Sequence, residues 1–137
     1  MCTKAVEQVA HRIGEFIAKV EANLVCGGLG GVMEAVSKGT KQAGGTTIGI
    51  LPGKDKKTAN PYIDIAIATG MGHARNTLVV QAADIIIALP GEYGTLSEIA
   101  NAMIYKKPVI SFNSWDIPGV IKVASIEETM RAVDTLL

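Results

Sequence analysis

Hydrophobic residues along the chain occur in two kinds of segment. One kind has the period of a helix, and the other is a continuous apolar run typical of a buried strand. Residues 4–20 place Val, Ile and Phe at spacings of three and four, opposite charged residues, which predicts an amphipathic helix. Residues 85–89 are five apolar residues in a row, which predicts a strand covered on both faces. The same patterns predict further helices at 32–43, 73–83, 96–106 and 125–137 and further strands at 24–26, 46–51, 63–68, 109–112 and 121–123.

Helices and strands alternate along the chain, and the connections between most consecutive strands are long. Crossovers of a dozen or more residues join parallel rather than antiparallel neighbours. We therefore predict an α/β fold, a Rossmann-like three-layer domain with a mostly parallel sheet and helices on both faces. A chain of 137 residues is long enough for one such core and not for two, so residues 1–137 are expected to form a single domain.

The composition agrees with this fold and excludes one class of partner. Hydrophobic residues make up 48% of the chain and aromatic residues only 4%, so Val, Ile, Leu and Ala must build the core, as in parallel α/β sheets. The 13 Lys and Arg residues equal the 13 Asp and Glu residues in number. Without net positive charge or a basic stripe, the chain is a poor candidate for binding a nucleic-acid backbone, and no such partner is expected.

The two cysteines, Cys2 and Cys26, form no C-x-x-C motif and have no histidine nearby. This argues against a disulfide framework or a metal site and favours a reducing compartment, with Cys26 expected to be buried and inert. The chain starts without a basic segment followed by an apolar one, and no apolar run approaches 18 residues. We therefore expect a soluble, cytoplasmic protein with no membrane partner.

Glycine follows within two residues after each of the first four predicted strands, at Gly27, Gly53, Gly70 and Gly91. In open α/β sheets the ligand lies beyond the carboxyl ends of the strands. A glycine loop that opens into a helix also offers free backbone N–H groups and the positive end of the helix dipole, which attract phosphate. The alternative is a tight turn that needs glycine, because the spacing matches neither a P-loop nor a dinucleotide fingerprint.

Three motifs carry a resemblance to a known family: residues 26–35 (CGGLGGVMEA), 72–76 (GHARN) and 90–98 (PGEYGTLSE). Together they resemble the LOG-like superfamily, long labelled lysine decarboxylase-like. The three motifs occur in the family's order, and the resemblance extends over nearly the whole chain. The superfamily includes cytokinin-activating phosphoribohydrolases and molybdenum cofactor carrier proteins, and the bacterial branch near those carriers is the nearest match. The resemblance implies a nucleotide-binding domain for residues 1–137 and a phosphorylated small molecule as partner.

The signature loop of the superfamily is Pro-Gly-Gly-x-Gly-Thr-x-x-Glu. Five positions match, namely Pro90, Gly91, Gly94, Thr95 and Glu98. Glu92 replaces the second glycine, and Ser97 stands where the active hydrolases carry a glutamate. By resemblance, Arg75 and Glu98 are the catalytic pair. The phosphate-binding residues implied in the same way are Gly27, Gly28, Gly30, Gly31, Pro90, Gly91, Gly94 and Thr95. His73 and Asn76 are expected to lie at the opening of the same site.

Each charged candidate also has a structural interpretation. Thr95-x-x-Glu98 has the spacing of a capping box, and the same spacing recurs at Ser125-x-x-Glu128, where no function is expected. Arg75 stands near a helix start, where the dipole disfavours a cation, so an anionic ligand or Glu98 would explain it, and a solvated arginine is the alternative. Lys54–Lys57 is expected to be a solvated loop rather than a phosphate lid.

The resemblance also implies a central strand before the first helix, whereas this sequence starts almost directly in that helix. The fold is therefore expected to lack the family's first strand, because the start is truncated or because the sheet closes over the gap. Ile99, Met103, Ile104 and Val79–Val80 make two helices apolar on more than one side. This suits a helix-mediated homodimer or higher homo-oligomer, which the family also forms.

Three functions follow as hypotheses. The first is binding of a nucleotide or a phosphate-bearing, nucleotide-like ligand, such as a molybdopterin-type molecule, without transforming it and with no cofactor required. The second is a phosphoribohydrolase that cleaves the N-glycosidic bond of nucleoside 5′-monophosphates. The third is a structural or sensing role with a vestigial site. Lysine decarboxylation is not expected, because that chemistry needs a lysine that holds pyridoxal phosphate, and apart from the exposed group at Lys54 no lysine is placed on a loop at a strand end.

Overall fold

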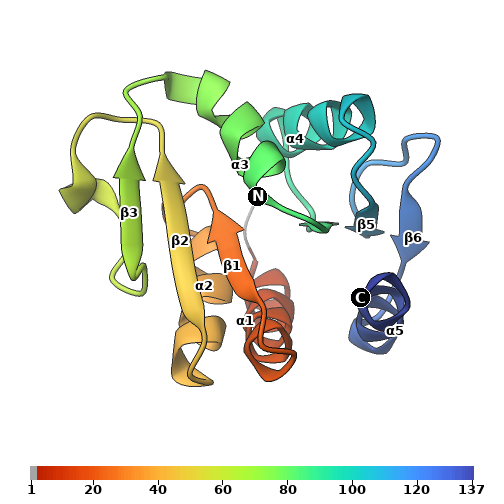
Figure 1. Cartoon of the computed structure of the whole chain (residues 1–137). Coiled ribbons are helices and arrows are strands. Elements are labelled where there is room, and N and C mark those ends of the chain that lie inside the picture. Colours follow the sequence, from red (N-terminus) through yellow and green to blue (C-terminus); the bar gives the residue numbers. More distant parts are fainter. Residues whose placement is uncertain (1–2) are drawn as a thin grey trace.

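The computed structural model describes residues 3–137 and shows helices that alternate with parallel strands (Figure 1). The helices are α1 (Lys4–Lys19), α2 (Val32–Gln42), α3 (Asn76–Ala82), α4 (Tyr93–Ile104) and α5 (Ile126–Leu136), with 3-10 helices η1 (Lys56–Thr58) and η2 (Gly72–Arg75). The strands are β1 (Asn23–Cys26), β2 (Thr46–Leu51), β3 (Ile65–Ala68), β4 (Ile86–Ala88), β5 (Val109–Phe112) and β6 (Ile121–Val123). The predicted α/β fold with flanking helices is confirmed.

The strands form two parallel three-stranded sheets, ordered β1-β2-β3 and β4-β5-β6, rather than one sheet. Cys26 pairs with Gly49 in the first sheet and Ala88 with Ser111 in the second. No strand pairing joins β1 to β4 within residues 3–137. Of the two explanations considered for the absent first strand, closure of the sheet over the gap is therefore wrong, since the two edge strands do not pair with each other.

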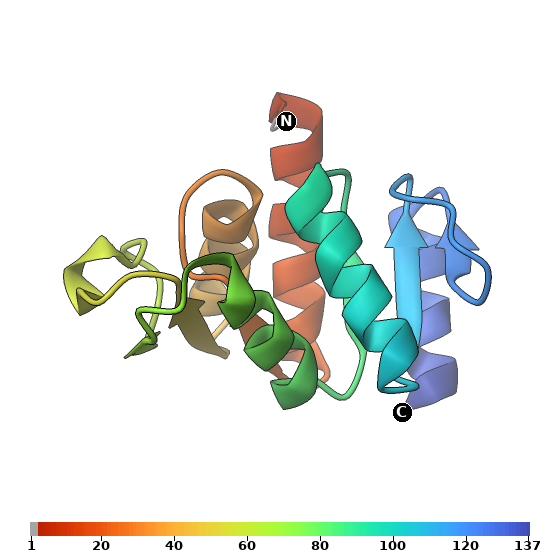
Figure 2. The same ribbon diagram turned by 90° about the horizontal axis from the view of Figure 1, so that it is seen from above.

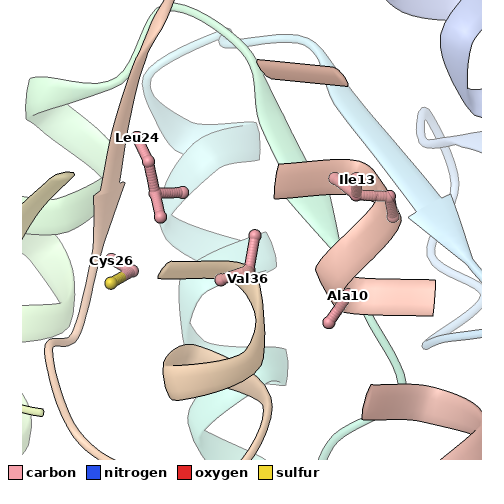
Figure 3. Packing of buried hydrophobic residues seen from close by; sticks show 5 residues of the cluster. All are labelled: Ala10, Ile13, Leu24, Cys26 and Val36. Atoms are coloured by element: carbon pink, nitrogen blue, oxygen red, sulfur yellow. The ribbon is translucent and has the colours of Figure 1, made fainter. Parts of the chain in front are cut away.

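Helix α1 connects the two sheets by side-chain packing. It lies between α2 and α5 (Figure 2). Five buried residues from α1, β1 and α2 form one cluster (Figure 3): Ala10, Ile13, Leu24, Cys26 and Val36. Ile87 and Leu89, in and just after β4, pack against this cluster. Val9 and Phe16 of α1 pack against the core of the second sheet.

Two glycines let α1 and α2 touch backbone to backbone. A Cβ atom at Gly39 would lie 2.0 Å from the carbonyl oxygen of His11, and one at Gly14 would lie 2.2 Å from the carbonyl oxygen of Val36. Any side chain at these positions would push the helices apart. The close crossing fixes α2, and with it the loop between β1 and α2.

Within residues 3–137, no helix combines the length and the apolar character that crossing a membrane requires.

Candidate functional site

Arg75 lies against the glycine loop that follows β1, at the C-terminal edge of the strands. A Cβ atom at Gly27 would lie 2.6 Å from Nη2 of Arg75 and 2.7 Å from Sδ of Met33. A side chain at position 27 would therefore displace the end of the Arg75 or Met33 side chain from its observed place. Gly27 and Arg75 belong to separate sequence motifs that were expected to form one site, and they are in contact in the fold.

Arg75 is almost fully buried, at 9% exposure, so the alternative of a solvated arginine is wrong. Nη1 donates a hydrogen bond to Oδ1 of Asn76, which is 3% exposed. The buried Nε atom has no hydrogen-bond partner among the described residues. Because a buried, unpaired donor on a charged group is costly, this atom is a place where an anionic ligand would be favourable.

Glu98, on α4, lies within electrostatic reach of Arg75. Burial raises the pKa of Glu98 from 4.5 to about 6, and the positive charge of Arg75 opposes part of that increase. Burial also raises the pKa of Cys26, and the negative charge of Glu98 raises it further. Three effects oppose this increase: a hydrogen bond with Ser37, a hydrogen bond with the Gly28 backbone, and the positive charge of Arg75. The fold thus gathers three ionisable side chains from β1, η2 and α4.

The capping interpretation of Glu98 is wrong. Helix α4 begins at Tyr93, three residues before the expected start at residue 96, and its N-cap residue Glu92 makes no side-chain cap hydrogen bond. Thr95 therefore lies inside the helix and cannot cap it. The matching pattern at Ser125-x-x-Glu128 does form a cap, in which the Glu128 amide donates to Ser125 Oγ at 3.1 Å.

The loop before α4 is shaped by one close contact. A Cβ atom at Gly91 would lie 2.2 Å from Oγ1 of Thr95, so this side chain folds back over the glycine. A Cβ atom at Gly94 would have no heavy atom within 4 Å. A side chain at position 91 would therefore force the Thr95 side chain to move, whereas position 94 is open. Pro90 follows β4, which ends at Ala88.

In the loop between β1 and α2, some glycines likewise have a structural reason and one does not. Gly28 and Gly31 have φ angles of 78° and 68°, which favour glycine. Gly28 also lies against the backbone of Gly49, with a Cβ position 3.2 Å from its Cα atom. Gly30 is exposed and has no heavy atom within 4 Å of a Cβ position. Backbone conformation therefore explains Gly28 and Gly31, while Gly30 needs another reason.

Asn60, which none of the sequence motifs contains, contacts the candidate glycine loop in the fold. It is 7% exposed, its backbone amide donates to the Gly28 carbonyl at 2.9 Å, and its Nδ2 atom donates to the Leu29 carbonyl at 2.9 Å. The Asn-Pro dipeptide at positions 60 and 61 is a turn signal in the sequence. It gives no indication that the turn reaches back 31 positions to the glycine loop.

A surface cavity of about 380 Å³ adjoins the loop at Gly31. Its other walls come from α1, α2 and the segment before β3, including Gln8, Lys38 and Tyr62. Neither Arg75 nor Glu98 lines it. The cavity therefore borders the glycine loop but is not the place where the side chains of Arg75, Glu98 and Cys26 meet.

The other charged candidates are exposed, and only one of the two cysteines is described by the structure. His73 is exposed, and residues 54–58 are exposed as expected of a solvated loop. Cys26 is buried and free, whereas Cys2 lies outside the described residues. In the described part of the chain, no three His, Cys, Asp or Glu side chains are grouped in a way that could hold a metal ion.

Comparison with known sequences identifies relatives over most of the chain. The family model described as the SLOG cluster4 family matches residues 1–135. An uncharacterised protein of Archaeoglobus fulgidus is 46% identical over 128 residues, which are 93% of this chain and 82% of that protein. A cytokinin riboside 5′-monophosphate phosphoribohydrolase of Arabidopsis thaliana is 38% identical over 96 residues, 64% of this chain and 42% of that enzyme. The chain thus spans less than half of this plant relative's length.

Solved structures match over almost the full length. The molybdenum cofactor binding protein of the phototrophic bacterium Rippkaea orientalis has 36% sequence identity and a TM-score of 0.93, and the match covers 99% of this chain and 90% of that chain. The molybdenum cofactor carrier protein of Chlamydomonas reinhardtii has 34% identity and a TM-score of 0.90, covering 98% and 89%.

Proposed function

Because the chain belongs to the SLOG cluster4 family of the LOG-like superfamily, close to molybdenum cofactor carrier proteins, we propose that it binds a phosphorylated, nucleotide-like small molecule. The observation that carries the proposal is the buried Arg75, whose Nε atom has no partner among residues 3–137 and whose Nη2 atom lies against Gly27. A guanidinium in this state needs an anion to complete its hydrogen bonds.

Two helix N-termini add to the attraction of this place for an anion. Helix α2 begins after Gly31, and α4 begins after Glu92. Neither N-terminus is capped by a side chain. Uncapped first-turn amides are hydrogen-bond donors without intrahelical partners, and the helix dipole favours negative charge beside them. In the proposal, residues 27–31 and 90–95 supply these amides to the phosphate.

Two ligand chemistries fit the proposal. The near full-length similarity to molybdenum cofactor binding and carrier proteins supports a molybdopterin-type ligand. The similarity to cytokinin riboside 5′-monophosphate phosphoribohydrolases supports a nucleoside 5′-monophosphate. Both molecules join a phosphate to a planar heterocycle, and neither requires the protein to hold a further cofactor.

Binding is tested by calorimetric titration of the protein with AMP and by native mass spectrometry with a molybdopterin-type ligand. We expect binding of at least one of them to the wild type and a loss of affinity of at least tenfold in Arg75→Ala, since the anion loses its buried cation. Arg131→Ala, which removes an exposed arginine of α5, is the matched control and should bind as the wild type does. Unchanged affinity in Arg75→Ala would refute the assignment of the site.

A second candidate function, phosphoribohydrolase activity, is favoured by the pKa of Glu98, which is about 6. Water would cleave the N-glycosidic bond of a nucleoside 5′-monophosphate to give the free base and ribose 5-phosphate. Positive charge develops on the ribose as that bond breaks, much as in glycoside hydrolysis. Glu98 would stabilise that charge or orient the water, and Arg75 would hold the phosphate.

Release of free adenine from AMP, followed by chromatography, separates the two functions. An enzyme should release adenine, and Glu98→Gln should abolish the release while AMP still binds, because the substitution removes the charge and keeps the shape. A binding protein should hold AMP without releasing adenine. Equal release by the wild type and Glu98→Gln would exclude Glu98 from the chemistry.

We also propose that the protein forms a homodimer or higher homo-oligomer through α4. Tyr93 and Ile104 are 80% and 71% exposed at the two ends of this helix. The exposed residues between them, Gly94, Ser97 and Ala100, are uncharged and small. Light scattering during gel filtration should give more than the monomer mass of 14.3 kDa, and Ile104→Asp should reduce it to that mass. A wild-type monomer would exclude this interface.

A further inference from the structure

Asn60 uses almost all of its hydrogen-bonding groups to connect the segment before β3 with the glycine loop after β1. Its backbone amide and its Nδ2 atom donate to the carbonyls of Gly28 and Leu29, each at 2.9 Å. Its Oδ1 atom accepts from the amide of Tyr62 at 3.0 Å, and its carbonyl accepts from Ile63 at 3.2 Å. A buried side chain with this many partners has one orientation.

The residue after it restricts Asn60 further. Pro61 disfavours the helical region for the preceding residue and keeps its backbone extended. The backbone amide and the side-chain amide of Asn60 therefore reach the glycine loop together as one rigid pair of donors. The loop itself has little intrinsic rigidity, since four of its five residues are glycine.

Holding the two carbonyls also sets the direction of two amides. In a trans peptide the carbonyl of one residue and the N–H of the next point in opposite directions, and the described chain contains no cis peptide bond. With the Gly28 and Leu29 carbonyls turned toward Asn60, the N–H groups of Leu29 and Gly30 point away from it. Neither amide donates to another described residue.

We propose that Asn60 is a positioning residue for anion binding, which holds the Gly28 and Leu29 carbonyls and so presents the Leu29 and Gly30 amides to the phosphate of the ligand. This inference rests on the proposed function and adds a residue that none of the three sequence motifs contains. It also gives a reason for Gly30, because an exposed glycine with open space at its Cβ position allows a ligand to approach its backbone closely.

The test uses the full chain and AMP as the probe. Asn60→Ala removes both side-chain hydrogen bonds, and Asn60→Asp keeps the acceptor for Tyr62 but places an oxygen against the Leu29 carbonyl. Both variants should weaken AMP binding at least tenfold. Thr129→Val is the matched control, because it removes a buried hydrogen bond of 2.9 Å from α5, far along the chain from the loop, and should lower only the melting temperature.

A second readout separates positioning from a general loss of stability. The ¹H–¹⁵N resonances of Leu29 and Gly30 should shift on addition of AMP to the wild type, and should move in Asn60→Ala even without ligand. They should stay in place in Thr129→Val. Weaker binding in Asn60→Asp together with wild-type binding in Asn60→Ala would assign the effect to added charge and overturn the inference.

The possible failures are distinguishable. If the wild type binds AMP and Asn60→Ala binds it equally well, the positioning role is wrong and the proposed function stands. If neither AMP nor inorganic phosphate shifts the Leu29 and Gly30 resonances of the wild type, those amides bind no anion, and the inference fails with the proposed site.

Discussion

At the scale of single residues, Arg75 and Glu98 of the cluster with Cys26 have features that suit ligand binding but lower the stability of the folded protein. Arg75 carries a buried donor without a described partner, and Glu98 must ionise in a largely buried position. Both features cost folding free energy in the absence of a ligand. Glu92, by contrast, lies exposed at the start of α4.

The first prediction concerns the stability of Glu98→Gln. The folded protein holds the proton of Glu98 up to a pKa of about 6, whereas the ordinary value is 4.5, so wild-type stability falls as the pH rises between these values. The full difference is worth about 2 kcal/mol above pH 7. Glu98→Gln should therefore be more stable than the wild type at pH 8 by up to that amount, with the gain disappearing below pH 4.5.

Urea denaturation at both pH values measures this effect. Glu127→Gln, which changes an exposed glutamate of α5, should alter stability by only a few tenths of a kcal/mol at either pH, roughly as surface substitutions do. A Glu98→Gln variant less stable than the wild type at pH 8 would show that the carboxylate is stabilised in the fold and not penalised.

The second prediction compares two glycines. Gly94→Ala places its methyl group in open space in the first turn of α4, so it should keep or raise stability, by about 0.5–1 kcal/mol at most. Gly28→Ala should destabilise the protein, because φ is 78° and the new Cβ would lie 2.7 Å from Leu51. Thermal unfolding measures both. A strongly destabilised Gly94→Ala would mean that folding, and not ligand approach, requires that glycine.

At the scale of elements, the sequence predicts where a helix or strand begins and ends when the capping or helix-breaking residue lies next to that end in the chain. Ser125 caps α5 as its spacing predicts, and the bounds of β2, β5 and β6 are those expected. Helix α4 starts three residues earlier than its sequence predicts, because Thr95 is a residue type typical of an N-cap but lies inside the helix, where its side chain contacts Gly91. Helix 73–83 likewise begins as the 3-10 helix η2, which places Arg75 in the interior.

The third prediction tests the contact between α1 and α2. Gly39→Ala would place a methyl group 2.0 Å from the His11 carbonyl oxygen, and neither helix backbone can yield without moving the loop after β1. Overpacking of this kind costs about 1–3 kcal/mol or more. We expect a clearly lower melting temperature in calorimetry, whereas Lys38→Ala at the neighbouring exposed position should change it little. Similar melting of both variants would contradict the close crossing.

At the scale of the whole molecule, the main feature is the break between two parallel sheets. Strand β1 pairs only with β2, and β4 only with β5, within the described residues. The halves are held together by the side chains of α1, which contact the cores of both. The charged cluster also spans this break, since Cys26 belongs to β1 and Glu98 follows β4.

The fourth prediction follows from the unpaired edges. Amides of β1 and β4 that face the break have no strand partner in the described chain, so they should exchange with deuterium faster than amides of the central strands β2 and β5. Hydrogen exchange followed by NMR gives the rates residue by residue. Equal protection of all four strands would mean that the edges are paired and that the break does not persist in solution.

The sequence by itself determined the kinds of elements, their parallel arrangement and the family. These depend on hydrophobic periodicity, on glycine and proline at strand ends, and on motifs that are contiguous in the chain. The pairing of Gly27 with Arg75 could be expected only by resemblance, because the two residues lie 48 positions apart and no local pattern links them.

Only the tertiary structure decided which candidates are buried, which glycines the fold itself requires, and that Asn60 holds the loop. That β1 and β4 stay unpaired with each other where the first strand is absent is likewise visible only in the fold. The physical reason is the same in each case. Burial, pKa and hydrogen bonding depend on what surrounds a side chain in space, and local sequence specifies the conformation of a segment without specifying its distant neighbours.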